Sequence, residues 1–418
     1  MHYKTRLFEN ILSLYALQGV NYILPLLTMP YLVRIIGPGK FGLIAFAMAF
    51  TQYFLVITDY GFNLSATRQI SKKRDDPGEV SKIFIAVMFI KFILMILCFV
   101  IACVIVISFQ KFRNDWNIYL ISFLSLLGNL LFPVWFFQGI EKIKFIAVLN
   151  FIAKVLTTAA IFIFIRKPSD YSIALLIQVS GVILSGVVGI ITVFIIYPIE
   201  YIKPNVALLK TTLIDGWSIF LSQVSVTLFS NTGIFILGLN ANSQTVGYYA
   251  IADKLVKAVI GLVAPVCNSI YPRVCALFSD SSEKAVAFLR KILLFGGIIF
   301  AVVSGTLFMS SDILIRLVTG SPNQFASLLI KIMSILPFTV FVDNIYGTQI
   351  LLNINKDREF LYAIVRTGLF SLGCSLIFVP IFGAIASATI FSLSGILIMT
   401  LMSLPVMREN IRLLTRYF

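Results

Sequence analysis

The sequence contains few charged residues and almost no histidine. Only 12% of its 418 residues are charged and 59% are hydrophobic, whereas about a quarter of a soluble domain is charged. The single histidine is His2, so the body of the chain cannot form a His-based triad, a histidine-containing zinc site or a histidine proton relay. We therefore expect no catalytic site, no cofactor and no metal site.

The cysteines also form no recognisable pattern. There are five of them, and an odd number without framework spacing argues against a disulfide scaffold. All lie in or beside apolar segments, so we expect small buried hydrophobic side chains. They are Cys98, Cys103, Cys267, Cys275 and Cys374.

Long apolar runs dominate the chain. A helix needs about 20 apolar residues to cross a bilayer, and such runs follow one another from Leu7 to Met407. Lys4 and Arg6 precede an apolar stretch that is too long for a signal peptide and lacks a cleavage site, so we expect this first helix to be retained. The pattern predicts an all-α polytopic membrane protein with helices near 8–33, 41–66, 83–109, 117–138, 146–165, 172–197, 215–238, 247–271, 291–310, 326–352, 359–380 and 383–405.

The distribution of basic residues predicts the orientation. The chain has 33 Lys and Arg against 18 Asp and Glu, a net charge of +15. If the N-terminus is cytoplasmic, twenty of the basic residues fall in cytoplasmic segments, seven in the opposite loops and six inside helices. The positive-inside rule then places both termini in the cytoplasm. The excess charge is a topology signal, and we expect no nucleic-acid partner.

A weak repeat relates the two halves of the chain. Polar and small residues recur at a constant shift of 205 positions in the second and eighth predicted helices, which is typical of two-bundle transporters. Chance is the alternative, because glycine and alanine are common in membrane helices. The repeat predicts two six-helix bundles, 1–205 and 206–418, around a central cavity. The matched pairs are Gly42 and Gly247, Ala45 and Ala250, Ala47 and Ala252, Gln52 and Lys257, Asn63 and Asn268, and Arg68 and Arg273.

Polar residues share single faces of the predicted helices. In the first helix they recur at steps of three and four residues, and the second helix repeats this pattern. A polar cavity accounts for both stripes, although hydroxyl and amide groups also join membrane helices by hydrogen bonds. The two prolines of the first helix predict a bendable gate, with a static kink as the alternative. The residues are Gln18, Asn21, Pro25, Pro30, Gln52, Asp59 and Asn63.

Six cations inside predicted helices are the most informative feature, because intramembrane charge is costly and usually marks a pathway. They are Lys91, Lys154 and Arg366 towards the cytoplasm, and Lys254, Lys257 and Lys331 towards the periplasm. We interpret them as two tiers of a cationic cavity for an anionic cargo such as a pyrophosphate; snorkelling to the membrane surface is the alternative. The acids of the predicted helices are fewer, namely Asp59, Asp253 and Asp343, and Asp253 is one helical turn from Lys257.

Five segments carry a resemblance to known proteins, namely NYILPLLTMPYLVRIIGPGKFG (21–42), TDYGFNLSAT (58–67), PVWFFQGIEK (133–142), YPR (271–273) and NIYGTQILL (344–352). They resemble one family of membrane proteins, the O-antigen flippases called Wzx. The resemblance extends over essentially the whole chain. It implies the multidrug/oligosaccharidyl-lipid/polysaccharide exporter fold, alternating access, and export of an undecaprenyl-pyrophosphate-linked repeat unit for lipopolysaccharide biosynthesis. It also implies a lipid-linked oligosaccharide substrate, membrane lipids and other polysaccharide assembly proteins as partners.

Two other functions remain open at this point. A multidrug cation antiporter of the same fold would need acidic residues to dominate its cavity, whereas here three acids face six cations. A polysaccharide polymerase or ligase would have a large periplasmic loop, whereas the longest one expected here runs only from about Ser311 to Phe325. Energy coupling is also open, with the membrane potential or an ion carried by Asp59 or Asp343 as the candidates.

Overall fold

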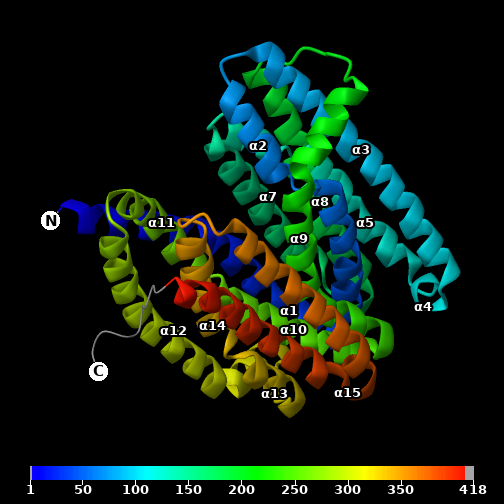
Figure 1. The fold of residues 1–418 in the computed structure, drawn as a ribbon. Coiled ribbons are helices and arrows are strands. Elements are labelled where there is room, and N and C mark those ends of the chain that lie inside the picture. The colour runs from blue at the N-terminus through cyan, green and yellow to red at the C-terminus, as the bar shows by residue number, and fades with distance from the viewer. Residues whose placement is uncertain (1, 410–418) are drawn as a thin grey trace, which may run out of the picture. The chain divides into compact units, whose positions relative to one another are not determined.

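The computed structural model describes the backbone of residues 2–409 and the side chains of residues 23–409. Gln18 and Asn21 therefore lie outside the described side chains. Helices make up nearly all of the described chain, as the apolar runs predict (Figure 1). In the first half they are α1 (His2–Asp59), α2 (Phe62–Lys73), α3 (Pro77–Ser108), α4 (Gln110–Arg113), α5 (Trp116–Leu131), α6 (Val134–Gly139), α7 (Ile143–Phe164), a 3₁₀ turn (Pro168–Asp170) and α8 (Tyr171–Ile196).

The second half has the same character. It contains α9 (Val206–Asn240), α10 (Ser243–Ile260), α11 (Val263–Asp280), α12 (Ser282–Thr319), α13 (Gln324–Met333), α14 (Leu336–Asn344), a π-helix (Ile345–Leu351) and α15 (Asp357–Arg408). Between residues 2 and 409 no strand interrupts this order.

Two glycines divide the longest helices. Gly37 in α1 has φ 79° and ψ 158°, and Gly383 in α15 has φ 59° and ψ −136°. Both conformations are accessible to glycine and costly for other residues, so each long helix is two helices joined at a tight bend. The prolines at positions 25 and 30 have helical backbone angles, and Gly37 is the one non-helical residue of α1.

With these bends counted, the helices match the twelve predicted ranges. Nine described segments are long and apolar enough to cross a membrane, and two of them, Ile23–Lys73 and Asp357–Arg408, contain the glycine bends. The remaining predicted helix, 247–271, corresponds to α10 and α11. α10 is more polar than the other spans because it carries Asp253, Lys254 and Lys257.

One predicted boundary is wrong. The helix expected to end at residue 310 continues to Thr319, where Gly320 caps it with φ 80°. The charged residues Asp312 and Arg316 lie in its last turns. Charged residues near the end of an apolar run resemble a loop in the sequence. The connection to α13 is therefore only residues 320–323, shorter than the loop expected from Ser311 to Phe325.

The order of broken and unbroken helices repeats along the chain. The helix after Gly37 is interrupted at Tyr60 and Gly61, as the α10–α11 pair is at 261–262. A long helix follows each pair, and then a second interrupted helix, α5–α6 in one half and α13–α14 in the other. The matched Ala47 and Ala252 are both 0% exposed. The internal repeat is thus visible in the elements as well as in the residues.

The chain forms two compact units, Ile35–Thr227 and a second one made of Met1–Arg34 and Leu228–Phe418. In the first unit α5 packs against α8 and α3, and α7 packs against α8 (Figure 1). Its core gathers aromatic residues of α2, α3 and α6 around the fully buried Trp135. The other unit has its own core along α11, α12, α14 and α15. The division of the sequence at 205 and 206 remains a prediction.

Candidate functional site

Lys91 lies in a buried polar cluster within the first unit. Its side chain is 2% exposed, and its Nζ donates to Asp59 Oδ1 at 2.9 Å. The same ammonium donates to Asn129 Oδ1 at 3.1 Å and to the Asn129 carbonyl at 3.4 Å. The Asn129 amide in turn donates to Asp59 Oδ2 at 3.5 Å. Each charge in this cluster is therefore paired and hydrogen-bonded, which is the condition for burying it.

The cluster lies at a break in a helix. α1 ends at Asp59, Tyr60 and Gly61 have φ 45° and 76°, and α2 starts at Phe62. A side chain at position 61 would lie 2.8 Å from Ile219, so both the backbone angle and the close packing require glycine. The last carbonyls of α1 lack partners in the helix, and the Lys91 ammonium beside Asp59 provides positive charge at this negative helix end.

Lys154 lies in a different setting on α7. Its side chain is half-buried, and its neighbours Phe151, Ile152 and Val155 are exposed apolar residues. Such an apolar exposed surface is typical of a helix that faces lipid. The position of Lys154 is thus compatible with either a cavity or snorkelling.

In the second unit, Lys257 forms the expected ion pair. Its Nζ lies 2.8 Å from Asp253 Oδ2, one turn earlier on α10, and it donates to the Ser230 carbonyl at 3.0 Å. It also lies 5.6 Å from the centre of the Phe391 ring. Asp253 is buried, so this contact neutralises a carboxylate inside the membrane-spanning fold.

Lys254 is the exposed residue of an otherwise buried stretch of α10. From position 246 to position 257, all side chains except that of Lys254 are buried or half-buried. A lipid-facing helix would present apolar side chains on its open side. Here the open side presents a lysine, which indicates a polar surface.

The other two cations of this unit are also accessible. Lys331 is paired with Asp312 at 2.9 Å. Arg366 is exposed, and its guanidinium lies 6.0 Å from the ring centre of Tyr362, one turn away on α15. Asp312 and the Asn129 that holds Lys91 were both missed in the sequence, because nothing in their local spacing connects them with their partners.

A second polar cluster surrounds the π-helix Ile345–Leu351. Gln349 is 1% exposed, and its amide donates to the Cys267 carbonyl at 3.1 Å and to Asn344 Oδ1 at 3.4 Å. Its Oε1 is buried without a hydrogen-bond partner. Asp343, half-buried, lies just before this segment, and Asn268, exposed, follows Cys267. π-helices often occur at functional sites, and Gln349 is a residue that the sequence analysis did not single out.

The remaining predicted cavity residues are partly accessible. Gln52 and Pro25 are exposed, while Asn63 and Pro30 are half-buried. The buried Thr28 donates to the Pro25 carbonyl at 3.1 Å, which satisfies a group in the helix that contains both prolines. Whether these residues gate or line a path remains a prediction.

The chain is similar to known proteins along its whole length. The profile of the family described as "Polysaccharide biosynthesis protein" matches residues 7–278. A protein of Escherichia coli (strain K12) named "Putative O-antigen transporter" is 32% identical over 408 residues, 97% of this chain and 98% of the relative. A protein of the same name from Shigella dysenteriae is 28% identical, over 84% of this chain and 87% of the relative.

Solved structures share the fold at low sequence identity. An inward-facing multidrug resistance MATE family transporter of the MOP superfamily has a TM-score of 0.72 and 14% identity, covering 93% of this chain and 94% of its own. The lipid II flippase MurJ, in an inward closed conformation, has a TM-score of 0.71 and 14% identity, covering 96% and 89%. The fold expected from the resemblance is confirmed. The chain therefore belongs to the polysaccharide biosynthesis protein family and has the twelve-helix fold of the MOP superfamily.

Proposed function

We propose that this protein is a flippase that moves an undecaprenyl-pyrophosphate-linked O-antigen repeat unit, or a related surface polysaccharide unit, from the cytoplasmic to the periplasmic leaflet. The observation that carries the proposal is the 32% identity to the O-antigen transporter homologue over 97% of the chain. The protein acts in the bacterial inner membrane with both termini in the cytoplasm, in agreement with the distribution of basic residues.

The intramembrane cations are the proposed contacts for the pyrophosphate. The side chains of Lys254 and Arg366 are exposed, so they are the most accessible of the six cations. Lys91, Lys257 and Lys331 hold carboxylates, and a pyrophosphate must compete with these carboxylates for them. The half-buried Lys154 completes the set. Charge-assisted hydrogen bonds of this kind are the usual way to bind phosphate groups.

The transport step is alternating access. In this scheme the broken helices at Gly61 and at 261–262 change shape while the long unbroken helices stay rigid, and binding occurs near interrupted helices, as in other transporters. Membrane lipids and other polysaccharide assembly proteins are the proposed partners.

A multidrug cation antiporter is the second candidate, because a MATE transporter shares the fold. The contacts of the described acids disfavour it. Asp59 and Asp253 are already neutralised by lysines, so only Asp343 of these three acids does not form an ion pair with a lysine. A cationic drug would therefore find few carboxylates to bind. A polymerase or ligase is disfavoured by the short connection at 320–323.

Transport by purified protein in vesicles tests the proposal. The protein is reconstituted with a fluorescent polyprenyl-pyrophosphate-linked oligosaccharide, and its appearance in the opposite leaflet is measured with and without a membrane potential. We expect translocation of the glycolipid and no accumulation of a lipophilic cationic dye. Dye transport without glycolipid translocation would instead establish the antiporter.

A further inference from the structure

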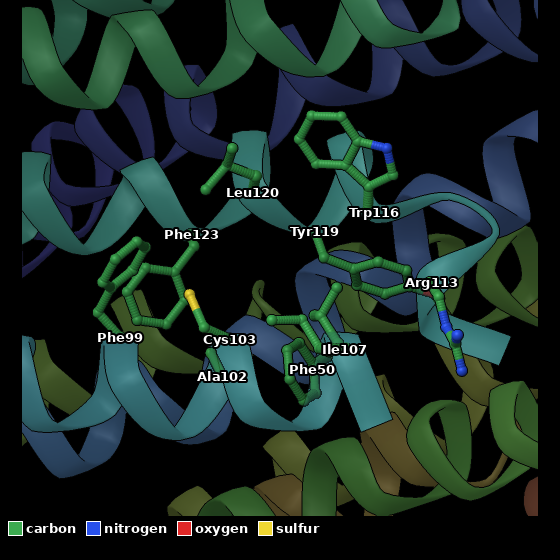
Figure 2. A pocket seen from close by; sticks show the side chains of 11 residues that line it. Phe50, Phe99, Ala102, Cys103, Ile107, Arg113, Trp116, Tyr119, Leu120 and Phe123 are labelled. Carbon is green, nitrogen blue, oxygen red and sulfur yellow. The ribbon is translucent and has the colours of Figure 1, made fainter. Parts of the chain in front are cut away.

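An apolar pocket lies between α3 and α5 in the first unit. Its volume is about 400 Å³, within the range of about 300–1,000 Å³ that is typical of ligand sites. Figure 2 shows Ala102, Cys103 and Ile107 of α3 on one side and Leu120 and Phe123 of α5 on the other. The remaining lining residues are Phe50, Phe99, Val106, Arg113, Trp116 and Tyr119.

The pocket lies at one surface of the membrane. α3 ends at Ser108 and α5 starts at Trp116, and both belong to membrane-spanning segments. The connection between them must therefore lie at the bilayer surface, on the periplasmic side in the proposed orientation. Trp116, which is 57% exposed, is well suited to this interface.

The short helix α4 beside the pocket carries two cations, and one of them, Arg113, lines the pocket. Lys111 and Arg113 are exposed on the short helix α4, and Asp115 follows, so the connection carries a net charge of +1. α4 is anchored by the buried Phe112, whose ring centre lies 5.0 Å from the ring centres of both Phe50 and Tyr119. The cations are thus attached to a fixed element beside an apolar pocket.

An apolar pocket beside positive charge indicates the chemistry of its ligand. The lining is mainly hydrocarbon and aromatic surface, which forms few hydrogen bonds with water. Apolar cavities of this kind stay dry. A hydrocarbon chain in the pocket would supply the van der Waals contacts that the lining atoms lack when the pocket is empty. Arg113 and the net positive charge of the connection then favour a head group with negative charge. Membrane phospholipid is the most abundant molecule of this chemistry around the protein, and mass action favours it.

We propose that this pocket binds one acyl chain of an anionic glycerophospholipid, with the phosphate of its head group at Arg113. The pocket shares no lining residue with the proposed cargo contacts, so its test does not depend on the flippase proposal.

Quenching of Trp116 fluorescence tests the site without any cargo. The Trp217→Phe variant keeps Trp116 as the reporter and the fully buried Trp135 as background. It is reconstituted in vesicles containing brominated phosphatidylglycerol or brominated phosphatidylcholine, and quenching is measured against the fraction of brominated lipid. One net positive charge at the surface should give about a fivefold preference for phosphatidylglycerol.

Two variants separate a built site from the general lipid environment. Arg113→Gln with Lys111→Gln should abolish the preference, and Cys103→Phe should reduce it by filling the pocket. Val104→Phe is the matched control, because Val104 is 58% exposed on the same helix and does not line the pocket. Equal quenching by both lipids in the Trp217→Phe protein, or an unchanged preference in Cys103→Phe, would overturn the proposal.

Discussion

At the scale of single residues, three of the six intramembrane cations form ion pairs with carboxylates, namely Lys91, Lys257 and Lys331. The sequence reveals that these charges exist, because each one stands out in an apolar run. It also reveals the pair of Asp253 and Lys257, since a spacing of four residues places both on one face of a helix. Sequence spacing contains no information about contacts such as the one between Asn129 and Lys91, which join different helices. Such partners require the tertiary structure.

The cluster at Lys91 gives a double-variant prediction. Lys91→Gln leaves the Asp59 carboxylate, 19% exposed, without its counter-ion, and we expect a loss of about 3 kcal/mol in stability. Adding Asp59→Asn should restore the thermal unfolding temperature in detergent, because no buried charge then remains unpaired. Export of surface glycan should stay low in both variants if Lys91 also binds the pyrophosphate. Full recovery of export in the double variant would show that Lys91 serves only as the counter-ion of Asp59 and does not bind the pyrophosphate.

Lys254 permits a second test of cargo binding, because its side chain is exposed. We expect Lys254→Gln to reach the membrane at normal abundance and to lower apparent affinity for the glycolipid about tenfold, the effect of removing one charge-assisted contact. Lys254→Arg should retain more transport because the charge is kept. Lys291→Gln, at an exposed lysine of α12 that the proposed orientation places near the cytoplasm, is the matched control. Equal transport by the position-254 Gln variant and this control would exclude a cargo contact.

At the scale of elements, hydropathy predicts the spans and misses their interruptions. The twelve ranges follow from apolar runs, whose length the bilayer dictates. The break at Tyr60 and Gly61 lies within one such run, so hydropathy contains no signal for it. The glycine at 61 could have been a hint, but many membrane helices contain glycine without breaking. What distinguishes Gly61 from the glycines inside unbroken helices is its φ of 76°, a backbone angle that the sequence does not show.

The break itself can be tested. Gly61→Ala places a Cβ at φ 76° and 2.8 Å from Ile219, so we expect a loss of about 2–4 kcal/mol in detergent unfolding experiments. Gly305→Ala is the matched control, since a Cβ there meets nothing within 4 Å and should slightly stabilise α12. An unfolding temperature that falls equally in both variants would argue against a special role for the break.

At the scale of the whole molecule, orientation follows from charge. We expect reporter fusions after Lys73, Glu283 and Phe418 to indicate cytoplasm, and fusions after Arg113 and Asn242 to indicate periplasm, because basic residues are retained on the cytoplasmic side. Paired phosphatase and fluorescent-protein reporters measure this directly. A periplasmic result for the fusion after Phe418 would contradict the even number of crossings.

The first 34 residues belong to the compact unit formed by the end of the chain, while residues 35–227 form the other unit. The polypeptide therefore passes between the units twice, after Arg34 and after Thr227. If the gene were split in the segment between α8 and α9, neither product would contain a complete unit. The C-terminal fragment would lack its opening helix, and the N-terminal fragment would carry that helix without its unit. Two such fragments would have to assemble by complementation, and neither would be an autonomous half-transporter.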